Sequence, residues 1–263
     1  MRVELPFSLV FAVSLLLAPL GAAHAQRGVT PAQIRTLLTS SDVGEIRNGI
    51  EAVGVVGTGP AVEPLVARIR AGLSPELLDL ALDTLLVASR PEAGPVLIEL
   101  TSHRRAAVRL KAVQALVASH ARGAEGCLTT ALNDGDPGVR SAAALGLGQL
   151  NARGAVETLF LALERGVLEA STAIGQLAAP ADIPRLRSYV GRLPFDAMTP
   201  AFSEILARRD VPERAKLDLI AQLAEVATAE VKTYLQEFVA SLPATDHSAV
   251  RRAAEDATLR IVN

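Results

Sequence analysis

The strongest constraint on the fold is a repeat of 31 residues that runs through much of the chain. Five apolar columns recur in four successive rows, and each of the twenty positions is apolar although only 50% of the chain is hydrophobic. A period of this length is typical of stacked repeat proteins. The columns are Ile46, Leu77, Val108 and Val139; Ile50, Ala81, Ala112 and Ala143; Val62, Ala93, Ala124 and Ala155; Val66, Leu97, Leu128 and Leu159; and Ile69, Leu100, Ala131 and Ala162.

The spacing inside each row predicts two helices. Apolar residues fall four apart, then resume after a gap at spacings of four and three, which places them on one face of each helix. Turn-forming residues occupy the breaks at 57–60, 89–91 and 151–154, and Ser74-Pro75-Glu76 is a typical helix start. Because one helix pair cannot bury its apolar face alone, the sequence predicts an all-α solenoid of stacked helix–turn–helix units. The aromatic content of only 3% suits this close helix packing.

One row carries a recognisable motif. Residues 136–148 begin with Asp136, continue with Val139-Arg140 and Ala143, and close with a small-Leu-Gly sequence. This pattern resembles the short HEAT-like repeat named after the phycobilisome lyases. Val108-Arg109 follows the same pattern. The resemblance implies a right-handed superhelix of paired helices that serves mostly as a binding scaffold.

The sequence divides into four parts. Residues 1–25 are a predicted signal peptide, and 26–41 form an N-terminal capping segment with a short helix near 31–39. Residues 42–191 carry the repeats, although the unit after Leu163 follows at a separation of 27 instead of 31. Residues 192–263 are either degenerate repeats or C-terminal capping helices, predicted near 196–209, 212–225, 227–241 and 246–261.

The N-terminal segment is typical of an export signal. Arg2 precedes an apolar run from Leu5 to Leu20, and Ala23-His24-Ala25 provides a small-x-small cleavage pattern before Gln26. We therefore expect cleavage between Ala25 and Gln26 and a periplasmic or secreted protein without a membrane span. An uncleaved membrane anchor is the alternative, because the run is nearly long enough to cross a bilayer.

Three acid–arginine pairs recur where a first helix begins: Asp42 with Arg47, Asp136 with Arg140, and Asp246 with Arg251. The acid suits an N-cap, and the resemblance implies a structural ion pair between neighbouring repeats. An anion-binding site is the alternative interpretation.

Composition and spacing argue against several functional classes. Cys127 is the only cysteine, which excludes a disulfide framework and multi-cysteine metal sites, and it is expected to be a small buried residue. The four histidines lack ligand spacing, so we expect no metal. Gly146 and Gly148 lie inside a predicted helix, where close packing explains them better than a phosphate loop, so no cofactor is expected. The net charge of −2 argues against nucleic-acid binding.

We therefore expect a monomeric, non-enzymatic, exported scaffold that binds a protein partner and has no catalytic residues. We expect second helices to line the concave side of the solenoid, so that a row of their exposed residues, stepping by 31, meets the partner: Arg68, Glu99, Thr130 and Leu161. Such a mixture of charge, hydroxyl and apolar side chain suits a protein surface. The alternatives are a lyase-like enzyme that attaches a chromophore, and a structural spacer in an envelope assembly.

Overall fold

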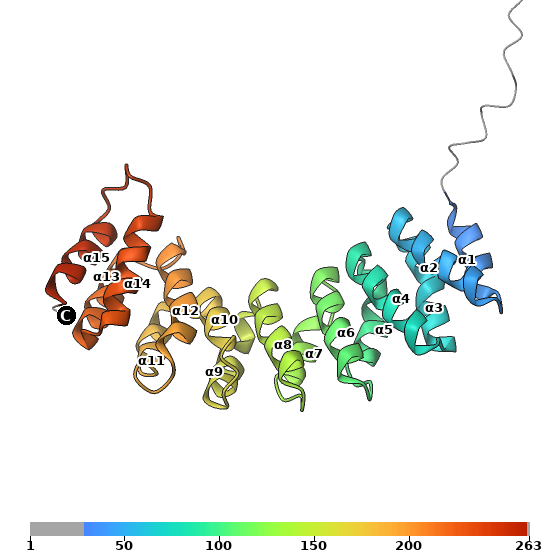
Figure 1. The fold of residues 1–263 in the computed structure, drawn as a ribbon, viewed down its shortest axis with the longest axis horizontal. Coiled ribbons are helices and arrows are strands. Elements are labelled where there is room, and N and C mark those ends of the chain that lie inside the picture. The colour runs from blue at the N-terminus through green and yellow to red at the C-terminus, as the bar shows by residue number, and fades with distance from the viewer. Residues whose placement is uncertain (1–28, 262–263) are drawn as a thin grey trace, which may run out of the picture.

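A computed structural model describes residues 29–261, which form a row of helix pairs (Figure 1). Helix α1 (Pro31–Thr39) packs on the first pair, and the Thr30 side chain caps it by accepting a hydrogen bond from the Gln33 backbone amide. This confirms the short helix predicted near 31–39. Residues 1–28, including the predicted cleavage point between Ala25 and Gln26, lie outside the described part of the chain.

Each pair has a first and a second helix. The first helices are α2 (Val43–Val56), α4 (Pro75–Ala88), α6 (Ala106–Ser119), α8 (Pro137–Gln149), α10 (Ala170–Leu177), α12 (Phe195–Ala207) and α14 (Ala229–Ser241). The second helices are α3 (Gly59–Ala71), α5 (Gly94–Leu100), α7 (Ala124–Ala131), α9 (Val156–Glu164), α11 (Ile183–Arg187), α13 (Glu213–Val226) and α15 (Ala249–Arg260). Single 3-10 turns, η1 (Pro91–Ala93), η2 (Arg153–Ala155) and η3 (Pro180–Asp182), precede α5, α9 and α11.

The helix boundaries follow local chemistry. Ser74 caps α4, and Pro75 is its first residue, as the sequence predicts. The first four first helices end near a residue in the left-handed conformation, which turns the chain toward the second helix. These residues are Gly57, Ser89, His120 and Asn151, with φ of 59°, 50°, 47° and 53°. Three of the four lie in the breaks predicted from the sequence.

The predicted apolar columns form the core. Nineteen of the twenty column residues are buried, and only Leu100 is half-buried. Ile50, Ala81, Ala112 and Ala143 are completely inaccessible to solvent. The all-α solenoid of stacked helix pairs is therefore confirmed, and its buried apolar residues form two core clusters, one in each half of the chain.

First helices pack more closely than second helices from α2 to α12. Small residues permit this: a Cβ added to Gly148 would lie 3.3 Å from the Cα of Ala173, and one added to Gly175 would lie 2.7 Å from the Cα of Ala201. The close-packing role predicted for Gly148 is confirmed. Because the closer layer of a curved stack lies inside the bend, first helices line the inner side, and Figure 1 shows α10 and α12 inside the arc and α9 and α11 outside.

The helix pairs continue to the C-terminal end, but their packing changes. There α13 and α15 lie closer to each other than α12 and α14 do. All four predicted helices of this region are present, with boundaries shifted by a few residues. Within residues 29–261, no helix combines the length and apolar character needed to cross a membrane.

Candidate functional site

The inner side of the arc exposes aliphatic side chains. Val55 of α2, Val87 of α4 and Leu145 of α8 are 86%, 75% and 38% exposed. They lie on first helices, off the core columns, and half-buried Leu86 and Leu110 accompany them. Single exposed apolar residues are normal on protein surfaces, but a set that follows one face of a solenoid is typical of a binding surface.

A groove between α6 and α8 forms part of this inner surface. Its volume is about 640 Å³, and its apolar lining includes Leu86, Leu110, Ala142 and Leu145. None of the described residues that line it is charged. Leu86 extends the groove onto α4, next to the exposed Val87. The surface therefore crosses three successive first helices.

Two glutamines provide the only side-chain amides of the groove lining, Gln114 on α6 and Gln149 on α8. Both are exposed. Neither amide makes a hydrogen bond to another described residue, so both are free to bind a ligand or water. Each amide offers donors and an acceptor together.

Ion pairs neutralise the polar part of the same layer. Arg105, the residue before α6, lies 2.9 Å from Asp79 of α4, and Lys111 of α6 lies 2.7 Å from Asp83 of α4. All four side chains are partly exposed, and such pairs contribute little to stability because water screens them. Their consequence is a nearly neutral surface beside the groove.

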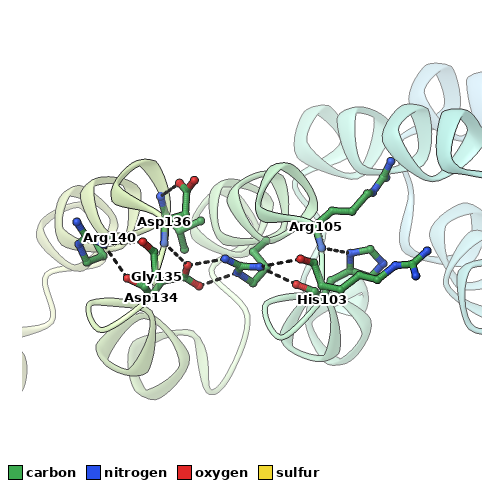
Figure 2. A network of polar contacts seen from close by, with 9 residues as sticks. His103, Arg105, Asp134, Gly135, Asp136 and Arg140 are labelled. Atoms are coloured by element: carbon green, nitrogen blue, oxygen red, sulfur yellow. Dashed lines mark hydrogen bonds and ion pairs between the residues drawn. The ribbon is translucent and has the colours of Figure 1, made fainter.

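A denser polar network joins the loops between repeats (Figure 2). The Arg109 guanidinium donates two hydrogen bonds to the Asp134 carboxylate, at 2.7 and 2.6 Å, and one to the His103 carbonyl at 2.9 Å. Arg140 repeats the carbonyl contacts one unit later, at 2.8 Å to Asp134 and 3.1 Å to Gly135. The arginine of the Val-Arg motif therefore closes its own loop, and Arg109 also reaches the next one.

Asp134 is the central carboxylate of this network. Hydrogen bonds from Arg109 hold its pKa below the ordinary value, against the opposing effect of burial. Its side chain also accepts a hydrogen bond from the Asp136 backbone amide at 2.8 Å. The network is structural, because its groups are satisfied by one another.

The predicted pairing of Asp136 with Arg140 is wrong. Asp136 caps α8 by accepting a hydrogen bond from the Val139 amide at 3.1 Å, and Arg140 binds backbone carbonyls. The inter-repeat ion pair instead joins the motif arginine Arg109 to Asp134. The two residues are 25 positions apart, and no local sequence pattern indicates this spacing. The N-cap part of the prediction is confirmed.

The other two predicted pairs are also absent from the described residues. Asp42 caps α2 through the Glu45 amide at 2.8 Å, and Arg47 makes no ion pair with it. Asp246 accepts a hydrogen bond from the Ser248 amide, and Ser248 itself caps α15. Arg251 binds Glu255 at 2.8 Å, one turn along its own helix. Capping and same-helix contacts satisfy these groups instead.

The predicted partner-binding row lies on the outer side, because second helices form that layer. Arg68 of α3 is half-buried, with an Nε that has no hydrogen-bond partner, and Glu99 of α5 binds Arg70 at 2.6 Å. Thr130 of α7 donates to the Gly126 carbonyl, and Leu161 of α9 is 45% exposed. The prediction that second helices line the concave side is wrong.

An outer cavity of about 830 Å³ lies between α5 and α7. Thr130, His103 and Cys127 line it, and the Cys127 Sγ lies 3.1 Å from the Thr101 Oγ1. Cys127 is half-buried instead of buried as predicted, because its position on α7 (Ala124–Ala131) faces this outer cavity. Within residues 29–261, no group of three His, Cys, Asp or Glu side chains could hold a metal ion.

Sequence reasoning missed the inner-face residues Val55, Val87, Leu145 and Gln149. A signal for some of them was present: Leu86, Leu110 and Leu145 are aliphatic residues of first helices outside the five core columns. Other apolar residues outside the columns, such as Leu85 and Leu116, are completely buried, so the pattern alone does not identify the exposed ones. Which helix layer lies inside the bend could be decided only from the distances between neighbouring helices in the structure.

The fold defines an α-solenoid, a class built from stacked helix pairs. Residues 94–166 match the family model described as HEAT repeats, which confirms the sequence resemblance over this part of the chain. No curated protein matches the sequence.

Two solved structures illustrate the similarity of fold. The complex of CpcE and CpcF of phycocyanin lyase from Nostoc sp. PCC7120 is 19% identical, with a TM-score of 0.47 over 95% of this chain and 100% of that chain. A designed armadillo repeat protein is 16% identical, with a TM-score of 0.41 over 88% and 99% of the two chains.

Proposed function

We propose that the protein is an exported, non-enzymatic scaffold that binds a protein partner on the inner face of its solenoid. One observation carries the proposal: aliphatic side chains of α2, α4 and α8 stay exposed along that face although the fold buries nearly every core column. The groove lining adds aliphatic, glycine and glutamine residues, which bind by packing and hydrogen bonding and supply no nucleophile or general base. Repeat solenoids commonly use such concave surfaces for binding.

Export is supported by the apolar segment and the Ala23-His24-Ala25 pattern of the leader. Expression of the full chain in a bacterial host with a periplasm tests it. N-terminal sequencing of the released protein should begin at Gln26 or find that residue blocked as pyroglutamate. Recovery of the full-length chain in the membrane fraction would favour the anchor and contradict export.

Binding is tested with a partner first identified by capture from an envelope fraction and then purified. Val87→Asp places a charge on the inner face at a residue that is 75% exposed, so folding should be preserved. The dissociation constant should rise at least tenfold, because a carboxylate would lose its hydration in the complex. Leu259→Asp on α15 is the matched control, since Leu259 is 82% exposed but lies outside the inner face of α2–α8. Equal binding by both variants would overturn the proposal.

A further inference from the structure

The α6–α8 groove has a chemistry of its own within the inner face. Elsewhere on the same layer α4 and α6 carry charged side chains, whereas none of the described residues lining the groove is charged. Of the charged side chains near the groove, Asp79 is paired with Arg105 and Asp83 with Lys111. The Asp136 carboxylate lies beside Gly138 of the lining, where it caps α8 by accepting a hydrogen bond from the Val139 amide. The residues that line the groove therefore offer no charged group. A charged occupant would lose its hydration there without gaining an ion-pair partner.

The two free side-chain amides further restrict which kind of ligand suits the groove. Gln114 and Gln149 come from opposite walls of the groove, one on α6 and one on α8. A side-chain amide presents an N–H donor and a C=O acceptor, the same pair that every peptide unit presents. An apolar small molecule leaves both amides without partners, whereas a polypeptide backbone satisfies both. The aliphatic walls suit side chains of moderate size.

The shape favours an extended segment. The groove continues from α8 across α6 to Leu86 on α4, beside the exposed Val87, so an occupant can span three helices. We propose that this groove binds an extended, uncharged segment of the partner protein, with Gln114 and Gln149 holding its backbone and Leu110 and Leu145 contacting its aliphatic side chains. The inference rests on the proposed scaffold function and specifies its recognition chemistry.

Synthetic peptides test the inference without a known partner. Three labelled pools of ten-residue peptides are compared by fluorescence anisotropy: a neutral pool of Ala, Val, Leu, Ser and Thr, and two pools with Lys or Glu at every third position. The neutral pool should bind the wild-type protein at least tenfold more tightly than either charged pool. Equal binding of the three pools, or tighter binding of a charged one, would overturn the inference.

Two further arms test backbone recognition. The double variant Gln114→Leu, Gln149→Leu should bind the neutral pool about tenfold more weakly, because two hydrogen bonds are lost. The control Gln236→Leu, at an exposed glutamine of α14, should bind like wild type. N-methylation of the peptide backbone should weaken binding to the wild-type protein to a similar extent, and this arm needs no variant.

The outcomes separate this inference from the proposed function. If Val87→Asp abolishes binding of the purified partner while the glutamine variant and N-methylation change nothing, the scaffold function stands and backbone recognition is wrong. If the neutral pool binds through the glutamines while Val87→Asp leaves partner binding intact, the groove is a peptide site and the proposed scaffold surface is wrong.

Discussion

The two halves of the solenoid build the same architecture from different side chains. Helices α1–α8 contain no aromatic residue, and their core consists of Ala, Val, Leu and Ile at regular spacing. Helices α9–α15 and their connections hold all six aromatic residues of the described chain: Phe160, Tyr189, Phe195, Phe202, Tyr234 and Phe238. The difference begins in the last row of the 31-residue period, where Phe160 stands between the column residues Leu159 and Ala162.

The aromatic half packs around ring contacts. Phe195, Phe202 and Tyr234 form a cluster with centroids 6.0 to 6.3 Å apart, and burial raises the pKa of Tyr234 to about 12. Phe160 stacks on Tyr189, with the Arg185 guanidinium 4.1 Å from the Phe160 centroid. Regular helices stack on small residues at matching positions, whereas irregular helices leave larger gaps that rings fill.

The largest expected effect concerns the ring cluster. Phe202 is completely buried, so Phe202→Ala should lower the free energy of unfolding by about 3–5 kcal/mol. Phe238→Ala is the control, because Phe238 is only half-buried on α14 and should lose clearly less. Urea denaturation followed by circular dichroism measures both. Equal losses would show that the rings are not the core of this half.

The regular half should be sensitive to added volume. Ala143 is completely buried between first helices, and Ala143→Leu should cost about 1–3 kcal/mol of stability by overpacking. Ala107→Leu makes the same change at an exposed position of α6 and should cost less than about 0.5 kcal/mol. Indistinguishable denaturation midpoints would contradict the assigned small-residue contact.

The same difference explains what could be predicted from the sequence. The repeat placed nineteen of twenty column residues in the core, because burial follows directly from periodicity. It did not identify the concave layer, since that depends on small differences in helix spacing set by residues such as Gly175. The Arg109–Asp134 pair was also missed, because its partners come from loops of neighbouring repeats. Local capping was predictable, and contacts between repeats were not.

A smaller effect is expected at the turn after α6. His120 adopts the left-handed conformation, with φ of 47°. This conformation is unfavourable for a residue with a Cβ atom but not for glycine. His120→Gly should therefore stabilise the protein by up to about 1 kcal/mol. The opposite sign is expected for Gln114→Gly, which puts glycine in the middle of the same helix and should cost about 0.5–1 kcal/mol. Thermal denaturation of the two variants distinguishes the outcomes, and a loss of stability in both would contradict this account of the turn.

The smallest effect is expected on the outer side, where Arg68→Glu combined with Glu99→Arg should leave partner binding within about twofold of wild type. The swap breaks the Glu99–Arg70 pair, but both side chains are about half exposed, so helicity and melting temperature should change little. Binding should be preserved because α3 and α5 lie outside the arc, whereas Val87→Asp on α4 should weaken it. The dissociation constants of the two variants show which helix layer binds the partner. If the swap weakens binding tenfold while Val87→Asp does not, the partner binds the second-helix layer, and the aliphatic inner face has another role.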